Sequence, residues 1–266
     1  MSKTVLICAR LFDGLSDTLA GPTEILIENN IIADIAQAVG RPASATVIDL
    51  GDRTVMPGFI DTHVHLCLDG LNLHQQVLQC SATKAMGEGC KQAMRAGVRS
   101  LEHCYLIDDE GIAMAEQSGV FLVPTMQMTR EDKAMLKAGK LPMQATWKFR
   151  RDVDEIERAQ KRIATSRVQV LYGTDCGMFP FDHGILEFQA MVAAGLTPVH
   201  ALKAATSVAA SLLERDDIGV LAAGKQADIV AMPGDPVANI AVTEKVDFVM
   251  RAGRIYRHQA FDVFQS

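Results

Sequence analysis

Short apolar, β-branched runs separated by turn residues occupy both ends of the 266-residue chain. Asn29-Asn30 joins two of these runs as a two-residue hairpin turn would, and Ala252-Gly253 joins two others near the C-terminus. The predicted strands are residues 4–8, 24–28, 31–35, 47–50, 226–232, 246–251 and 254–257. Because both ends show this pattern of short strands and turns, we expect residues 1–57 and 215–266 to form one small composite β-sandwich domain.

The middle of the chain alternates apolar runs with segments of helical period. The predicted strands are residues 98–103, 120–125 and 168–173. One predicted helix begins at Asp108, and three others cover residues 150–167, 185–194 and 197–213. Alternation of strands and helices is typical of parallel β/α units. Residues 129–148, which include Trp147, are expected to form either a loop over the site or a structural insertion.

Composition and charge narrow the class of protein. Apolar residues make up 48% and charged residues 22%, and the net charge is −6 without any basic block, so nucleic acid and anionic membranes are excluded as expected partners. No apolar run approaches the roughly 18 residues of a membrane span, and residues 5–9 are too short a run for a signal peptide. The six cysteines form no C-x-x-C pair, which indicates reduced thiols in a cytoplasmic protein.

The most informative stretch is residues 55–66, which contains His63 and His65. On a strand, side chains two apart share a face, so both imidazoles would point to the same side. Two histidines at the end of a buried strand supply half of a metal site, because buried polar groups need partners. The alternative is a pair of polar residues on a solvated face, but the apolar residues on either side favour a buried strand.

His103 and Asp175 each follow an apolar strand, at the end where the site of a parallel barrel lies. Gly173, just before Asp175, lets backbone come close. Taken alone, His103 is more typical of a polar residue satisfied by its neighbours, and Asp175 of a helix cap. Together with the His-x-His pair, they predict a metal site.

These elements resemble the amidohydrolase superfamily. His-x-His after Pro57-Gly58-Phe-Ile-Asp61, Glu-His at residues 102–103 and Gly-Thr-Asp at residues 173–175 occur in that family's order. Residues 98–103 and 181–184 are most similar to its imidazolonepropionase-like branch, which includes proline-dipeptidase-type members. The resemblance implies a TIM-type (β/α) barrel that hydrolyses an amide or cyclic amide C–N bond with a metal-activated water.

The resemblance also implies roles for individual residues. His63 and His65 would hold a first divalent metal, for which zinc is the expected ion. Asp175 would bind that ion and act as the catalytic general base, accepting the proton of the attacking water and delivering it to the leaving nitrogen. His103 would be a ligand of a second metal.

The spacing of the motifs departs from the family pattern. A (β/α)₈ barrel takes about 31 residues per unit, so the five units from His65 to His103 would need about 155 residues. Only 38 residues separate the two histidines. We therefore expect an incomplete barrel over residues 58–214, without most of strands two to five and with a join near residues 84–89. The missing part is where the family keeps a bridging carboxylated lysine and another histidine; Lys84 is the nearest substitute but reads as helical surface.

Two functions remain open from the sequence: a metal-dependent amidohydrolase holding one or two ions, and a catalytically impaired or inactive remnant of such an enzyme. The expected substrate is a small molecule or an Xaa-Pro-type dipeptide, with His183 and Tyr105 as its predicted contacts; the alternative for His183 is a plain loop residue. About four strands with open edges would favour self-association, so a homo-oligomer is expected.

Overall fold

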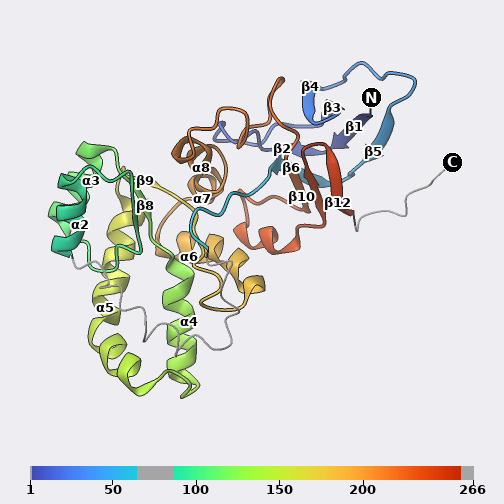
Figure 1. Cartoon of the computed structure of the whole chain (residues 1–266). Coiled ribbons are helices and arrows are strands. Elements are labelled where there is room, and N and C mark those ends of the chain that lie inside the picture. Colours follow the sequence, from blue (N-terminus) through green and yellow to red (C-terminus); the bar gives the residue numbers. More distant parts are fainter. Residues whose placement is uncertain (1, 65–86, 259–266) are drawn as a thin grey trace. The chain divides into compact units, whose positions relative to one another are not determined.

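The computed structural model describes residues 2–64 and 87–258, which divide by their contacts into two compact units (Figure 1). The first unit comprises the chain up to Ile60 together with the chain from Pro198, and the second comprises residues 61–197. Each unit is described by itself. Sheets and helices in both confirm the expected mixed α/β fold, whereas the described strands of the second unit form no closed barrel.

A four-stranded sheet in the first unit is built from N-terminal residues alone. Its strands are β1 (Lys3–Cys8), β3 (Thr23–Glu28), β4 (Ile31–Ala36) and β5 (Thr46–Asp49), in the order β4-β3-β1-β5. Strand β3 runs antiparallel to both β1 and β4, and β5 runs parallel to β1. The turn between β3 and β4 falls at Asn29, whose φ of 58° is a conformation that asparagine tolerates better than most residues. The predicted hairpin is therefore present.

A five-stranded sheet in the same unit combines the two ends of the chain. Its strands are β2 (Arg10–Leu11), β6 (Arg53–Pro57), β10 (Ile229–Pro233), β11 (Phe248–Arg251) and β12 (Arg254–His258), in the order β12-β11-β10-β6-β2. Strand β6 pairs antiparallel with β10, so that Pro57 lies opposite Ile229. One core cluster takes buried side chains from both sheets, including Leu6, Ile25 and Phe248.

Three short helices complete the first unit: α7 (Pro198–Ala204), α8 (Ser207–Leu212) and the 3₁₀ helix η2 (Ile240–Lys245). The single helix predicted over residues 197–213 is therefore wrong. Thr206 leaves the helical conformation, with φ −133° and ψ −100°, while its hydroxyl donates to the carbonyl of Leu202 at 2.8 Å. This local side-chain bond accompanies the break.

The second unit holds a three-stranded parallel sheet, with β7 (Ser100–Glu102), β8 (Phe121–Val123) and β9 (Gln169–Val170) in sequence order. Its helices are α2 (Gly87–Arg95), α3 (Asp109–Ser118), α4 (Met126–Lys137), α5 (Met143–Thr165), η1 (Phe181–Leu186) and α6 (Glu187–Ala194). Asp108 caps α3 as predicted, because its side chain accepts from the backbone of Gly111 at 2.8 Å. The described sheet thus has three strands rather than about four.

Most of residues 129–148 lie in α4 and α5, so of the two expectations for this segment the loop is wrong, whereas the structural insertion stays a prediction. Gly139, with φ 68°, follows the end of α4, and Pro142 precedes the first turn of α5. Glycine is common just after a helix and proline at the start of one. Together they define a short connection between α4 and α5. Trp147 lies exposed on α5, and α4, α5 and α6 pack against one another (Figure 1).

Among the described helices, none is long and apolar enough to cross a membrane.

Candidate metal centre

The segment that carries His63 is not a strand, which corrects the sequence prediction for its described part, residues 61–64. Asp61 accepts three hydrogen bonds: from the backbone of His63 at 3.1 Å, from the backbone of Thr174 at 3.1 Å and from the Thr174 hydroxyl at 2.6 Å. A side chain that bonds local backbone in this way competes with a regular strand ladder. Burial raises the pKa of Asp61.

Backbone bonds nevertheless hold this segment beside residues 172–175. Thr62 donates its backbone N–H to the carbonyl of Tyr172 at 3.1 Å, and Asp175 donates its own to the carbonyl of His63 at 2.7 Å. The absence of a side chain at Gly173 permits the approach, because a Cβ there would lie 2.9 Å from His63 Cβ. The close approach expected at this glycine is present.

His103 and Asp175 are presented by turns beyond the parallel sheet. His103 comes directly after β7, and its backbone N–H donates to the carbonyl of Val123 at 2.7 Å. Both residues have positive φ, 67° for His103 and 61° for Asp175. A non-glycine residue in this region is strained, and such strain concentrates at functional sites.

These residues converge into one group, since ligand-type atoms of His63, His103 and Asp175 all lie within 4.8 Å of one another. Asp175 Oδ1 lies 3.3 Å from His63 Nε2, and Asp175 Oδ2 lies 3.9 Å from His103 Nδ1. The two imidazoles meet edge to face, with ring centroids 4.8 Å apart. The Asp175 carboxylate, which accepts from the imidazolium form of His63, raises the pKa of that ring above its usual value. The carboxylate is buried and both rings are partly exposed, so the group opens toward solvent on the histidine side.

Thr125 orients the His103 ring. Its hydroxyl lies 2.9 Å from His103 Nδ1 and 3.4 Å from the Tyr105 hydroxyl. Thr125 is also the residue that precedes α4, but its side chain makes no capping bond to that helix, and its backbone is left-handed with φ 46°. The Thr125 hydroxyl, which would ordinarily cap α4, therefore contacts His103 instead.

Glu187 supplies the missing cap from a distant part of the chain. Its carboxylate accepts the backbone N–H of Met126 at 2.9 Å and that of Gln127 at 2.5 Å, the first two residues of α4. Carboxyl oxygens at a helix N-terminus satisfy its free N–H donors. Burial nevertheless raises the pKa of Glu187 to about 8, because the side chain has no contact with solvent. Asp61 contributes to this rise, whereas the two backbone bonds and Arg130 partly offset it.

The raised pKa of Glu187 predicts a specific pH dependence of stability. The native state retains the proton up to about pH 8, while the unfolded chain loses it near the ordinary glutamate pKa of 4.5, so stability falls as the pH rises through this interval. Urea unfolding at pH 5.5, 6.5 and 7.5 should show the wild-type free energy of unfolding falling more steeply than that of Glu187→Gln. The expected difference in slope is at most about 1.4 kcal/mol per pH unit. Parallel slopes for the two proteins would contradict it.

The other predicted site residues lie as follows. Tyr105 is buried beside the group, with its ring centroid 5.4 Å from that of His103, and burial raises the pKa of its hydroxyl. His183 lies on η1, where its Nδ1 pairs with Glu131 of α4 at 3.0 Å, so it is outside the three-residue group. His65 and Lys84 lie outside the described residues, as do residues 84–86 of the predicted join.

Three residues that shape the group were given no role from the sequence. Asp61 and Thr125 are polar residues that directly follow apolar runs. Such positions are often functional, so the sequence carried a signal for both. Glu187 offered none, because a glutamate at the start of a helix is ordinary and its partners, Met126 and Gln127, lie about 60 residues away.

The donor set fits a divalent cation. Neutral imidazole nitrogen and carboxylate oxygen are ordinary ligands of zinc, at about 2.0–2.2 Å, so a tetrahedral ion spaces its ligand atoms about 3.3 Å apart. The 3.3 Å between Asp175 Oδ1 and His63 Nε2 matches this spacing, and the contact of Thr125 with His103 Nδ1 leaves Nε2 of that ring for an ion. Thr125 beside His103 is a partner of the type that fixes the tautomer of a metal-binding histidine.

Comparison with known proteins defines the class. The sequence model of the amidohydrolase family matches residues 76–256, and the chain belongs to this family. The prediction of the family is therefore confirmed. Among its relatives are the ochratoxinase of Aspergillus niger, 27% identical over 176 residues, and the imidazolonepropionase of Cutibacterium acnes, 26% identical over 194 residues.

These matches cover 64% and 71% of this chain but only 36% and 42% of the two relatives, so the chain spans about two fifths of their length. Among solved structures, a Xaa-Pro dipeptidase with methionine bound in its active site is similar with a TM-score of 0.86 and 20% identity, over 96% of this chain and 100% of that one. Identity this low shows a shared fold only.

Proposed function

We propose that this protein is a metal-dependent amidohydrolase that hydrolyses an amide or cyclic amide C–N bond in a small molecule or an Xaa-Pro-type dipeptide. The observation that carries the proposal is the convergence of His63, His103 and Asp175 beyond the parallel strands. In parallel β/α architectures, catalytic groups lie at this edge of the sheet. The dipeptide substrate is supported by the likeness to the Xaa-Pro dipeptidase structure, and small amides by the relatives that match in sequence.

The three residues would hold one divalent cation, which we propose to be zinc because imidazole and carboxylate ligands suit it. Two further points stay predictions: that His65 is also a ligand of this ion, and that a second ion binds. When bound, a divalent metal polarises the scissile carbonyl and lowers the pKa of a coordinated water. We further propose that the second unit is an incomplete TIM-type barrel and that the two sheets of the first unit form a β-sandwich.

The chain's own residues supply the proton transfers and the positioning. Asp175 accepts the proton of the attacking water and then delivers it to the leaving nitrogen. Its backbone bond to the carbonyl of His63 fixes the carboxylate beside that ring. Thr125 holds the His103 ring in one orientation, and Tyr105 contributes a buried wall next to it. We keep Tyr105 and His183 as proposed substrate contacts.

The inactive remnant considered from the sequence is less well supported. A remnant without selection on its chemistry has no reason to keep three donor residues from distant segments in one group, with strained backbone at two of them. Hydrolysis is therefore the function to test.

The test is hydrolysis of a panel of Xaa-Pro dipeptides, N-acyl amino acids and hydantoin-type rings. Turnover is expected with zinc-loaded protein, to be lost on chelation and to return when zinc is added back. Asp175→Asn is expected to lower kcat by at least about 10³-fold, because the general base and one metal ligand go together. Turnover that survives both chelation and this substitution would come from another site or a contaminant and would contradict the proposal.

Replacing Thr125 with valine is expected to weaken zinc binding by about 10–100-fold, the usual cost of losing the partner of a metal-binding histidine. Valine keeps the branched shape and loses the hydroxyl that contacts His103 Nδ1. Thr125→Ser is the matched control, because it keeps a hydroxyl and should stay near wild type. Zinc affinity measured by competition with a chromophoric chelator checks the pair. Equal affinities for the valine and serine variants would show that the hydroxyl does not orient the ring.

A further inference from the structure

The connection between helices α4 and α5 forms the tip of a helical hairpin, at the end away from strands β8 and β9 (Figure 1). We define the hairpin tip as residues 134–151, which comprise the last turn of α4, the connection and the first turns of α5. It holds five basic residues and no acidic one, in a chain whose net charge is −6. Positive charge is therefore concentrated at the tip although the whole chain is acidic.

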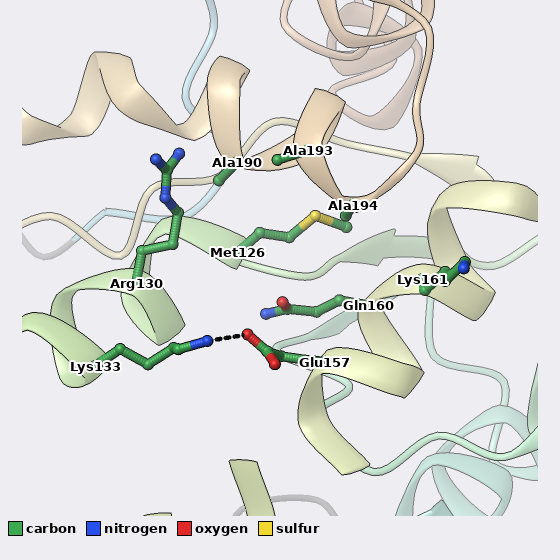
Figure 2. A pocket seen from close by; sticks show the side chains of 9 residues that line it. All are labelled: Met126, Arg130, Lys133, Glu157, Gln160, Lys161, Ala190, Ala193 and Ala194. Atoms are coloured by element: carbon green, nitrogen blue, oxygen red, sulfur yellow. Dashed lines mark hydrogen bonds and ion pairs between the residues drawn. The ribbon is translucent and has the colours of Figure 1, made fainter. Parts of the chain in front are cut away.

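Part of the positive charge of the hairpin is offset locally. Lys133 of α4, just before the tip, is joined to Glu157 of α5 by the dashed line in Figure 2, and Arg151 pairs with the neighbouring Asp152. The other cations of the tip are exposed and have no ion-pair partner among the residues that the structure describes: Lys137, Lys140, Lys148 and Arg150. Such a surface attracts an anionic partner.

Two exposed apolar side chains lie among these cations. Met143 is 80% exposed and Trp147 is 68% exposed, the two highest values for large apolar side chains in the part of the chain that the structure describes. They are one helical turn apart on α5 and so share a face, and the Arg151 guanidinium lies 5.2 Å from the centroid of the Trp147 ring. The buried face of α5 is formed by other residues, such as Phe149 and Ile156. The exposed pair is therefore not part of the core.

We infer that the hairpin tip binds the surface of an anionic lipid bilayer, with Met143 and Trp147 entering the headgroup region and the cations facing the lipid phosphates. Tryptophan beside lysine and arginine on a helix is typical of segments that lie at a membrane interface. Each cation near an anionic bilayer strengthens binding about fivefold. The inference departs from the expectation drawn from net charge because the charge is concentrated locally, and it does not depend on the proposed hydrolysis.

Two other partners fit the hairpin tip less well. The phosphates of a single-stranded nucleic acid would pair with the cations, and a base would stack on Trp147, but neither contact uses Met143. A tip-to-tip contact with a second copy of the chain would bring two sets of like charges together, which opposes association. A bilayer surface suits both the cations and the apolar pair, because its anionic headgroups lie directly above hydrocarbon.

Trp147 is the single tryptophan of the chain, so its fluorescence reports on the hairpin tip alone. At fixed ionic strength, vesicles of equimolar phosphatidylcholine and phosphatidylglycerol are expected to shift its emission to the blue, and brominated lipid in them to quench it. Vesicles of phosphatidylcholine alone should do neither. Lys140→Gln combined with Lys148→Gln should weaken binding to the anionic vesicles at least about tenfold, and Met143→Ser at least about threefold.

The matched control is Lys161→Gln combined with Lys245→Gln, which removes the same charge from exposed positions outside the hairpin tip. This control should bind the anionic vesicles as the wild type does. All the substituted side chains are exposed, so the variants should fold. Light scattering without vesicles, and titration with a single-stranded oligonucleotide, test the two other partners.

Several results would overturn the inference. They are an unchanged emission with anionic vesicles, equal binding to phosphatidylcholine alone, and equal weakening in the two double variants, which would mean that only overall charge matters. Self-association that shifts the emission to the blue without vesicles would assign the hairpin tip to a second copy. An oligonucleotide that shifts the emission and displaces the vesicles would assign it to nucleic acid.

Discussion

Zinc affinity is expected to fall by more than about a hundredfold when His63→Ala and Asp175→Asn are combined. Losing a single partner of a ligand costs about 10–100-fold, and this variant removes two of the three ligands themselves. Asp175 Oδ1 and His63 Nε2 are 3.3 Å apart, so both atoms would bind the same ion. Competition with a chromophoric chelator measures the affinity, and loss of zinc-dependent hydrolysis should accompany its fall.

A matched control for this variant is His200→Ala combined with Asp182→Asn. Both residues are exposed and lie outside the three-residue group, so the control removes the same types of side chain. It should bind zinc as the wild type does. If the two double variants bound zinc equally well, the ion would be held elsewhere and the proposed centre would be wrong.

Replacing Gly173 with alanine is expected to destabilise the protein by about 2–3 kcal/mol, the cost of overpacking a site that cannot relax. The added Cβ would lie 2.2 Å from Val123 Cγ1 and 2.9 Å from His63 Cβ, and Val123 is completely buried. Relief of the first contact requires β8 to shift, and relief of the second moves a metal ligand. Zinc affinity should therefore fall together with the urea midpoint.

Val123→Ala provides the internal test of this explanation. Alone it removes buried methyl groups and should cost about 1–3 kcal/mol. In the Gly173→Ala background it also removes the 2.2 Å contact, so the two substitutions should be less destabilising together than their sum. A coupling of at least about 1 kcal/mol is expected from a double-mutant cycle. Additive effects would mean that the cost at Gly173 has another origin.

Much of the fold was predictable because local patterns and the final structure agree. The strands of the first unit follow β-branched runs, and Asn29 marks their hairpin. Helix α4 was missed although Gly139 and Pro142 mark its end and the start of the next helix. The polar composition of this segment favours a loop, but its helix-boundary residues define two helices joined by a short turn.

The site was predictable in part, for a physical reason. His103 and Asp175 each follow an apolar strand, and their metal roles were implied by the resemblance, in which His-x-His, Glu-His and Gly-Thr-Asp occur in the family's order. The conformation around His63 was not predictable, because it depends on Asp61 bonding Thr174, a residue 113 positions away. The same holds for Glu187, which caps α4 from another helix. Such long-range side-chain bonds leave no periodic trace in the sequence.

The most direct test of the metal centre is an anomalous difference map from crystals of the protein grown with zinc, measured on both sides of the zinc edge. A strong peak is expected within bonding distance of His63, His103 and Asp175. A peak bound by other residues, or none in protein loaded with stoichiometric zinc, would contradict it.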